Sequence, residues 1–294
     1  MRYRLDNPEF RAIPVHPANA GTVKYQLLAT QERIWVVREH GRYGYAETQD
    51  FGSVPLSGEN TITFQRLDQV EPDMKFVSGR NFYWITVGEQ LLVKEQQFNQ
   101  SFWFGANQDK YRLVRLYPDH KEIDATVAST LRQIVSAGGE TYAEGPDAAV
   151  YVLDQDLLVK QQYKIRGEKW VGRLSPIGGG QLLIGDSPFD LKTGDFYWDA
   201  AGATKKEYPV KEWSTAAGDP YGLVWFADNT DAHRLRLIAA TRDGQIVTDN
   251  QVAPHELNQY SPVVLLPSKD ALIVAAIGSY QGEEHLLVFK FKRT

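Results

Sequence analysis

The side chains that could carry out nucleophilic or acid–base chemistry are scattered along this chain. The Gly-x-Ser-x-Gly turn that presents a catalytic serine in one large hydrolase fold does not occur. The chain has six histidines, and none is spaced as the His-Glu-x-x-His zinc motif requires. They are His16, His40, His120, His233, His255 and His285. We therefore expect surface or turn histidines, and we predict no catalytic residue, no metal ligand and no cofactor.

Two acidic segments have the composition of a cation-binding loop or of a tight turn. Asp154-Gln155-Asp156 and Asp228-Asn229-Thr230-Asp231 each offer two carboxylates, but neither has the glycine and distal glutamate of a calcium loop. Asx-rich hairpin turns have the same composition, so both segments are predicted to be turns. Carboxylates in exposed turns are available to a partner. The predicted partner-binding acids are Asp154, Asp156, Asp228 and Asp231.

Glycoside hydrolysis is the enzymatic alternative, because it needs a pair of carboxylates on either side of the scissile bond. Propeller hydrolases place such pairs in a central cleft. Candidate pairs come from two groups, Asp186, Asp190 and Asp195 in one and Asp219 and Asp228 in the other. With 37 acidic residues in the chain, such pairs arise by chance. A carbohydrate-binding or glycoside-hydrolysing propeller is therefore the alternative function.

Aromatic side chains are the stronger indication of a binding surface. The chain has 15 Tyr, 13 Phe and 7 Trp, and most of the tryptophans fall in strand-like segments, where core packing accounts for them. Trp213 and Tyr221 instead lie in loop-like sequence, the second within Gly218-Asp219-Pro220-Tyr221. An exposed tryptophan or tyrosine is a natural anchor for a protein partner or a sugar ring. Both are predicted as partner-binding residues.

Short strands separated by turns must position these residues. Leu223–Ala227, Arg234–Thr241 and Ile246–Thr248 are strand-like runs divided by Asx- and glycine-containing turns, and three more strands follow between Val263 and Phe291. Many short strands without crossover helices predict an antiparallel all-β fold. Radial repetition of small sheets favours a β-propeller over a barrel or a sandwich. At roughly 40–50 residues per blade, we predict six or seven blades in a single all-β repeat domain over residues 1–294.

Two segments depart from this pattern. Asp124–Ser136 has an N-cap residue at Asp124, apolar residues on one helical face and Gly138-Gly139 as a stop, which predicts a helix. Gly178-Gly179-Gly180 leads into a strand and not a helix, so it is interpreted as a flexible connection and not as a phosphate-binding loop.

One stretch of the chain occurs twice. Phe76-Val77-Ser78-Gly79 precedes an apolar run and Leu91-Leu92-Val93-Lys94. Tyr142-Ala143-Glu144-Gly145 and Leu157-Leu158-Val159-Lys160 repeat the pattern 66 residues further along. The apolar frame repeats while the turn inside it differs, so each copy is predicted to be the same hairpin-bearing unit. The helix prediction conflicts with this duplication, because the first copy is preceded by a segment that looks less helical.

The duplicated stretch resembles the DKNYW repeat family of bacterial proteins over residues 51–165. The residues that carry the resemblance are Leu56-Ser57-Gly58, Thr63-Phe64-Gln65-Arg66-Leu67 and Phe76–Trp84, then Thr130-Leu131 and Tyr142–Tyr151. The Asp-Lys pair of the family is absent, since Gly79-Arg80 and Gly145-Pro146 stand in its place. The resemblance implies a β-rich scaffold without catalytic residues, and some relatives look like immunity proteins that neutralise toxins of neighbouring bacteria.

Composition narrows the classes of partner. The 32 Lys and Arg against 37 Asp and Glu give a net charge of −5, which lacks the basic footprint of a nucleic-acid binder. Lys290, Lys292 and Arg293 are interpreted as solvated strand-edge residues that block edge-to-edge pairing. The chain has no cysteine, which excludes disulfides and a thiol nucleophile.

No stretch has the roughly 18 apolar residues of a membrane helix, and the N-terminal residues include no apolar signal segment. We therefore expect a soluble bacterial protein that binds neither membrane nor nucleic acid. Its expected location is cytoplasmic, or periplasmic had a leader been removed. The predicted function is a non-enzymatic protein-binding module, in its sharpest form an immunity or inhibitor protein that neutralises a bacterial toxin.

Overall fold

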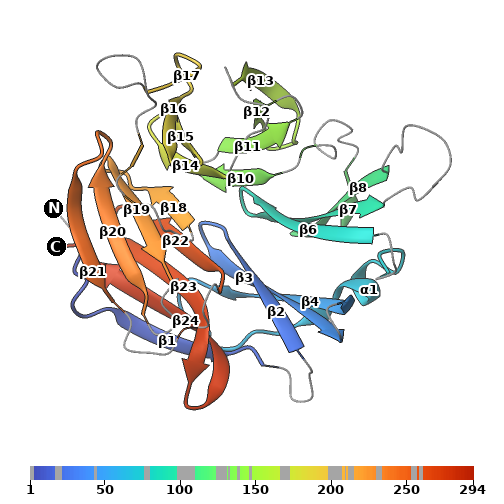
Figure 1. Ribbon diagram of the computed structural model, residues 1–294. Helices are drawn as coiled ribbons and strands as arrows, with labels where there is room; N and C mark the ends of the chain where they lie inside the picture. The colour runs from blue at the N-terminus through green and yellow to red at the C-terminus, as the bar shows by residue number, and fades with distance from the viewer. Residues whose placement is uncertain are drawn as a thin grey trace.

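The computed structural model consists of six four-stranded antiparallel sheets arranged radially around an axis (Figure 1). It describes residues 3–16, 22–42, 45–75, 80–97, 110–123, 131, 133–137, 140–145, 148–165, 173–197, 207–208, 210, 215–229, 234–252, 257 and 261–294. Each sheet is one blade of a β-propeller. The predicted all-β propeller is confirmed, and the number of blades is six.

The first three blades follow one another along the chain. Blade 1 consists of β2 (Thr22–Ala29), β3 (Arg33–Arg42), β4 (Tyr45–Pro55) and β5 (Gln65–Arg66). Blade 2 consists of β6 (Arg80–Val87), β7 (Gln90–Gln97), β8 (Lys110–Tyr117) and β9 (Lys121–Glu122). Blade 3 consists of β10 (Ile134–Ala137), β11 (Glu140–Gly145), β12 (Ala149–Leu153) and β13 (Val159–Lys164). Within the described residues the one helix, α1 (Leu67–Val70), is a single turn between blades 1 and 2.

The last blade closes the ring with a strand from the other end of the chain. Blade 4 consists of β14 (Leu174–Gly178), β15 (Gln181–Ile184), β16 (Ser187–Asp190) and β17 (Asp195–Phe196). Blade 5 consists of β18 (Thr215–Gly218), β19 (Leu223–Asp228), β20 (Arg236–Thr241) and β21 (Ile246–Gln251). Blade 6 consists of β22 (Val263–Pro267), β23 (Ala271–Tyr280), β24 (Glu283–Lys292) and β1 (Glu9–Pro14). Because β1 pairs with β24 along its whole length, the N-terminal and C-terminal segments hold each other in place.

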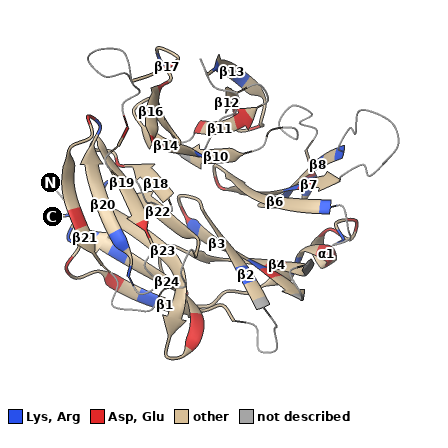
Figure 2. Ribbon diagram, in the orientation of Figure 1, with Lys and Arg blue, Asp and Glu red and all other residues tan. Residues whose placement is uncertain are grey.

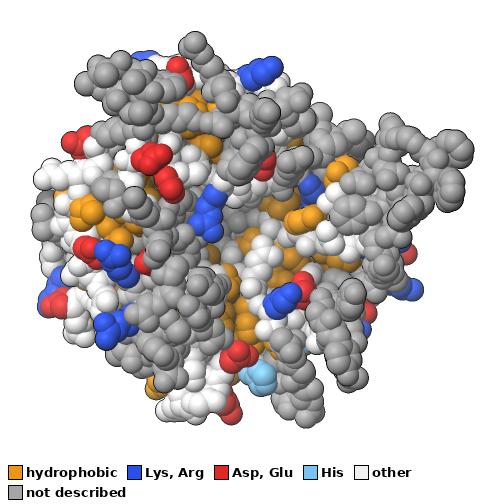
Figure 3. Space-filling view, viewed as in Figure 1, with side chains coloured by type: hydrophobic (Ala, Val, Ile, Leu, Met, Phe, Trp, Pro, Cys, Tyr) orange, Lys and Arg blue, Asp and Glu red, His pale blue; other side chains and the backbone are white. Residues whose placement is uncertain are grey.

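The first strand of blades 1 to 5 and β22 of blade 6 lie next to one another around the axis. The space-filling view shows a hollow near the centre, lined by hydrophobic side chains (Figure 3). We call the end that carries the turns between first and second strands, such as Asp219–Gly222, the turn end, and the opposite end the link end. Blades 1 and 2 are hydrogen-bonded at the turn end, where the backbone N–H of Gln31 donates to the carboxylate of Glu89 over 2.7 Å.

Each pair of neighbouring blades buries an apolar cluster between facing sheets. Strand β23 shows why: Leu272 and Val274 face blade 5, while Ile273 and Ala275 face blade 1. A strand buried on both faces has an uninterrupted apolar sequence, as β23 does. Each fully buried aliphatic side chain contributes about 1.5–3 kcal/mol, so these clusters hold the blades together.

The helix predicted over Asp124–Ser136 is wrong in its last turn. This part of the segment belongs to β10, where Val135 pairs with Tyr142 of β11, while residues 124–130 and 132 lie outside the described residues. Val135 also packs into the cluster between blades 3 and 4. Sheet pairing and burial of a β-branched side chain therefore outweigh the helical spacing of the apolar residues.

The duplicated stretches Phe76–Lys94 and Tyr142–Lys160 both contain a hairpin, but the hairpins occupy different positions in their blades. The first is β6–β7, the inner pair of blade 2, and the second is β12–β13, the outer pair of blade 3. Each copy thus holds a hairpin, as predicted, but the two hairpins are not equivalent parts of a blade. Inner strands begin 40 to 58 residues apart, so the 66-residue offset is not the blade repeat. The two stretches share the apolar pattern that any such hairpin requires.

The three glycines at 178–180 form the turn between β14 and β15 and not a loose connection. Their φ angles are +77°, +63° and +74°, which is the left-handed region that glycine occupies without strain. The guanidinium of Arg242, from blade 5, packs on Gly179, where a Cβ atom would lie 2.0 Å from Nη1. Only glycine leaves room for this contact between blades.

Candidate functional site

The most exposed tyrosine of the described residues stands on a tight turn at the turn end of blade 5. Asp219 is buried, and its Oδ1 accepts the backbone N–H groups of Tyr221 and Leu223 over 2.8 and 2.9 Å. Its Oδ2 accepts the indole N–H of Trp225 over 3.2 Å. The buried carboxylate thereby fixes the turn and presents Tyr221, whose surface is 48% exposed.

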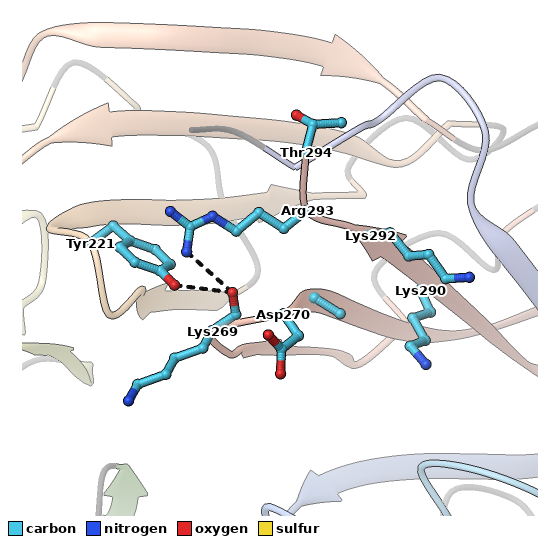
Figure 4. A pocket seen from close by; sticks show the side chains of 8 residues that line it. Tyr221, Lys269, Asp270, Lys290, Lys292, Arg293 and Thr294 are labelled. Atoms are coloured by element: carbon cyan, nitrogen blue, oxygen red, sulfur yellow. Dashed lines mark hydrogen bonds between the residues drawn. The ribbon is translucent and has the colours of Figure 1, made fainter.

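Tyr221 is held against blade 6 by two contacts (Figure 4). The guanidinium carbon of Arg293 lies 3.2 Å from the centroid of the tyrosine ring. The Tyr221 hydroxyl and Arg293 Nη1 both donate to the carbonyl oxygen of Lys269, over 3.1 and 3.2 Å. A cation stacked on a ring contributes about 0.5–1 kcal/mol at an exposed site. The tyrosine is thus exposed but fixed in orientation.

A basic pocket of about 490 Å³ lies beside this tyrosine. We call it the Tyr221 pocket, and it is lined by Tyr221, Lys269, Asp270, Ala271, Lys290, Lys292, Arg293 and Thr294. Four of these side chains are cationic and one is acidic. Blue residues on β24 mark part of this charge in Figure 2.

Glu9 of β1 offsets part of the positive charge. Its carboxylate lies 2.5 Å from Lys292 Nζ and 3.5 Å from Lys290 Nζ, and the hydrogen bond from Lys292 lowers the pKa of Glu9. Lys269 is exposed and has no carboxylate partner among the described residues. An anionic group entering the pocket would meet this ammonium without displacing an ion pair.

Tyr3 bonds the turn between β22 and β23, next to the pocket. Tyr3 is buried, donates to the carbonyl oxygen of Ser268 over 2.6 Å and packs edge-on against Trp225. Burial raises the pKa of Tyr3 to about 12, so its phenol stays neutral. Tyr3 therefore ties the N-terminal segment to the β22–β23 turn that supplies Lys269.

The other predicted partner-binding residues do not gather around Tyr221. Asp154 and Asp156 lie at the turn end of blade 3, and Asp154 Oδ1 accepts the backbone N–H groups of Asp156 and Leu158 over 2.9 Å each. The predicted Asx turn is thus present there. Asp228 is buried at the link end of β19. Trp213 and Asp231 lie outside the described residues.

The structure places two of the carboxylate pairs considered for glycoside hydrolysis. Asp219 precedes β19 and Asp228 is its last residue, so the two lie at opposite ends of a strand that is about 17 Å long at 3.4 Å per residue. Catalytic carboxylates lie about 5–9.5 Å apart. Asp190 and Asp195 are cross-strand neighbours, but on β16 and β17, the two outer strands of blade 4.

The described histidines have structural partners. Three contact a carboxylate: His16 with Glu284, His40 with Asp50 and His120 with Glu71. His285 contacts the carbonyl oxygen of Glu283, while His233 and His255 lie outside the described residues. The described part of the chain holds no group of three or more His, Cys, Asp and Glu that could bind a metal ion. Nor does that part include a helix long and apolar enough to cross a membrane.

Sequence reasoning missed the cationic side of the pocket. Lys290, Lys292 and Arg293 were expected to be solvated edge residues, and β24 is instead covered on its edge by β1. The alternation of basic residues at 290 and 292, which places both on one face of a strand, was a usable signal. Lys269 carried no signal, because a lysine in a turn is ordinary.

No family model and no curated protein matches the chain. Among solved structures, the α-L-arabinofuranosidase Arb93A of Fusarium graminearum is similar at a TM-score of 0.50 and 8% identity, with 97% of each chain covered. A mutant of Trypanosoma rangeli sialidase with trans-sialidase activity is similar at a TM-score of 0.49 and 10% identity. That match covers 98% of this chain, which spans only 57% of the sialidase. Structural neighbours thus include propeller glycoside hydrolases, and at these identities the likeness shows the fold alone.

Proposed function

We propose that this propeller is a non-enzymatic protein-binding module and that the Tyr221 pocket receives an acidic segment of its partner. The observation that carries the proposal is a fixed, half-exposed tyrosine beside four cationic side chains, on a protein whose net charge is −5. A local basic pocket on an acidic protein favours partners that carry a local cluster of negative charges.

The energetics of such a site favour Tyr221 as the anchor. Tyrosine is enriched among interface residues whose truncation costs 2 kcal/mol or more, because it buries a large rigid surface and has a polar end. Arg293 and Lys269 already hold the ring, so little side-chain entropy is lost on binding. Lys269 and its cationic neighbours add long-range attraction that speeds association.

The sharper form of the proposal is an immunity or inhibitor protein that neutralises a bacterial toxin. Its support is the resemblance of residues 51–165 to DKNYW repeat proteins, some of which look like immunity proteins. In this form the partner would be a secreted toxin encoded by a neighbouring gene, and one equivalent of this protein would abolish the toxin's activity.

A carbohydrate-active propeller is the second candidate. The observation that favours it is the exposed ring of Tyr83 on β6 beside the exposed amide of Asn81, because an aromatic ring can stack on a sugar and an amide can bond its hydroxyl groups. For hydrolysis a pair of carboxylates would also be needed, and Asp219 and Asp228 are too far apart to form one.

Affinity purification from the source cell tests the protein-binding proposal. Wild-type protein is expected to retain a partner, and the double variant Tyr221→Ala, Lys269→Glu is expected to retain at least about tenfold less, corresponding to about 1.4 kcal/mol. Lys164→Glu is the matched control, because Lys164 is exposed on β13 of blade 3 and is not part of the pocket. The proposal is refuted if no partner is retained or if the double variant retains as much as the control.

A further inference from the structure

The four cationic side chains of the Tyr221 pocket do not all point the same way (Figure 4). Lys290 and Lys292 of β24 line the pocket, but their ammonium groups extend away from Tyr221. Lys269 and Arg293 lie on the side of Tyr221, and the guanidinium of Arg293 stacks on its ring. The pocket therefore has two parts, one beside Tyr221 and one formed by the two lysines of β24.

Glu9, the first residue of β1, accounts for the orientation of the two lysines. The register of β1 and β24 sets Glu9 directly opposite Lys290. Lys292 lies two residues further along β24, so it shares a face of the sheet with Lys290. The Glu9 carboxylate lies 2.5 Å from Lys292 Nζ and 3.5 Å from Lys290 Nζ. The hydrogen bond from Lys292 lowers the pKa of Glu9, so this carboxylate is ionised at neutral pH.

The backbone that carries Glu9 is held in place from two sides. All six residues of β1 pair with β24, and Ile13 of β1 is fully buried. Arg11, the next residue on the face of Glu9, donates to the backbone carbonyl oxygens of Pro55 and Leu56 over 3.2 and 3.1 Å, at the end of β4 in blade 1. Strand β1 is thus tied to blades 6 and 1, and it keeps the Glu9 carboxylate beside the pocket.

The ion pairs of Glu9 are exposed and therefore easily exchanged. The side chains of Glu9, Lys290 and Lys292 are 51%, 39% and 66% exposed. Exposed ion pairs contribute little to stability, because water screens the charges and both side chains lose conformational freedom. A ligand that brings its own carboxylates can take the place of Glu9, but it binds more weakly than it would if the two lysines had no partner.

Lys269 differs from these lysines, because it has no carboxylate partner among the described residues. One acidic side chain can bind there without competition, whereas further acidic side chains must meet the two lysines that Glu9 neutralises. Resting on the function proposed above, we propose that Glu9 is a built-in competitor in the Tyr221 pocket. It holds Lys290 and Lys292 away from Tyr221 until a run of acidic residues of the partner displaces it, and so it weakens the preference of the pocket for such runs.

Calorimetry at low salt with a peptide of six aspartates tests the inference. The wild type is expected to bind the peptide, and Glu9→Gln is expected to bind it about two- to fivefold more tightly, since exposed ion pairs have this magnitude. Glu283→Gln is the matched control, because it removes the same charge from the first residue of β24, about 24 Å from Lys290 at 3.4 Å per residue. At that distance its charge is largely screened, so this variant should bind as the wild type does.

A second comparison separates release of the lysines from a general change of charge. In the background of Lys292→Gln, the substitution Glu9→Gln should give a smaller gain in affinity, because one of the two ammonium groups that it releases is absent. An effect of charge through space alone would give the same gain with and without Lys292.

Three results would overturn the inference. Glu9→Gln could bind the peptide no more tightly than Glu283→Gln, its gain could be unchanged by Lys292→Gln, or neither the wild type nor Glu9→Gln could bind the peptide. The proposed function is judged separately, because retention of a partner by the wild type and its loss in the Tyr221→Ala, Lys269→Glu double variant do not require Glu9. Since Glu9 is exposed, its variant should fold.

Discussion

Removing the buried charge of Lys94 should make this protein more stable at neutral pH. Burial lowers the pKa of Lys94 from 10.5 to about 8. Each unit of pKa corresponds to 1.36 kcal/mol, so the folded state disfavours the charged form by about 3 kcal/mol. Lys94→Met keeps the length of the side chain and removes the charge. It also removes the hydrogen bond to the Leu131 carbonyl oxygen, at a cost of about 1 kcal/mol. The expected net gain in the free energy of unfolding at pH 7 is about 2 kcal/mol.

The pH dependence of stability provides the sharper test. In the unfolded chain Lys94 keeps its proton up to about pH 10.5, whereas in the folded protein it loses the proton near pH 8. Between these values the unfolded state binds more protons, so the contribution of Lys94 to stability increases as the pH rises. Below pH 8 the full penalty applies. The advantage of Lys94→Met should therefore be largest below pH 8 and shrink toward pH 10.

Urea unfolding followed by tryptophan fluorescence at pH 7 and pH 9.5 measures both effects. Lys164→Met is the control, because Lys164 is exposed on β13 and its loss should leave the unfolding free energy unchanged within about 0.5 kcal/mol. The reasoning is refuted if Lys94→Met is less stable than the wild type at pH 7. It is also refuted if the difference between the two proteins is the same at both pH values.

Three further substitutions test how the ring is held together. Gly218→Ala should prevent folding or lower the melting temperature by many degrees. The added Cβ would lie 1.8 Å from the backbone oxygen of Ile177 on the neighbouring inner strand. A melting temperature close to that of the wild type would contradict this close approach. Asp219→Ala should lower the free energy of unfolding, measured by urea titration, by about 2–4 kcal/mol. The substitution leaves the buried indole N–H of Trp225 and two backbone N–H groups without their acceptor. An unchanged midpoint would contradict the role assigned to the carboxylate. Ile13→Ala, on the strand that closes the ring, should lower the free energy of unfolding by about 2–5 kcal/mol because Ile13 is fully buried. A loss below 1 kcal/mol would mean that ring closure contributes little to stability.

The strands and their turns were predictable because their signals are local. The three strands expected between Val263 and Phe291 are β22, β23 and β24, and the turn at Asp154 was expected from its Asx residues. Apolar alternation and turn residues act over two to six positions, and the sequence displays them directly. The same local rules failed over Asp124–Ser136, where sheet pairing with β11 decided the conformation of its last turn.

The arrangement of the sites was decided by the tertiary structure. The Tyr221 pocket joins a turn of blade 5 to Lys269 and to the end of β24, segments that are adjacent because blades 5 and 6 pack against each other. The register of β6, β7 and β8 likewise places Lys94 beneath Tyr83 and Tyr111. The sequence by itself determined an all-β chain of hairpins with Tyr221 in a loop. Which side chains meet across blades is set by pairing and packing between distant segments, and no local pattern contains that information.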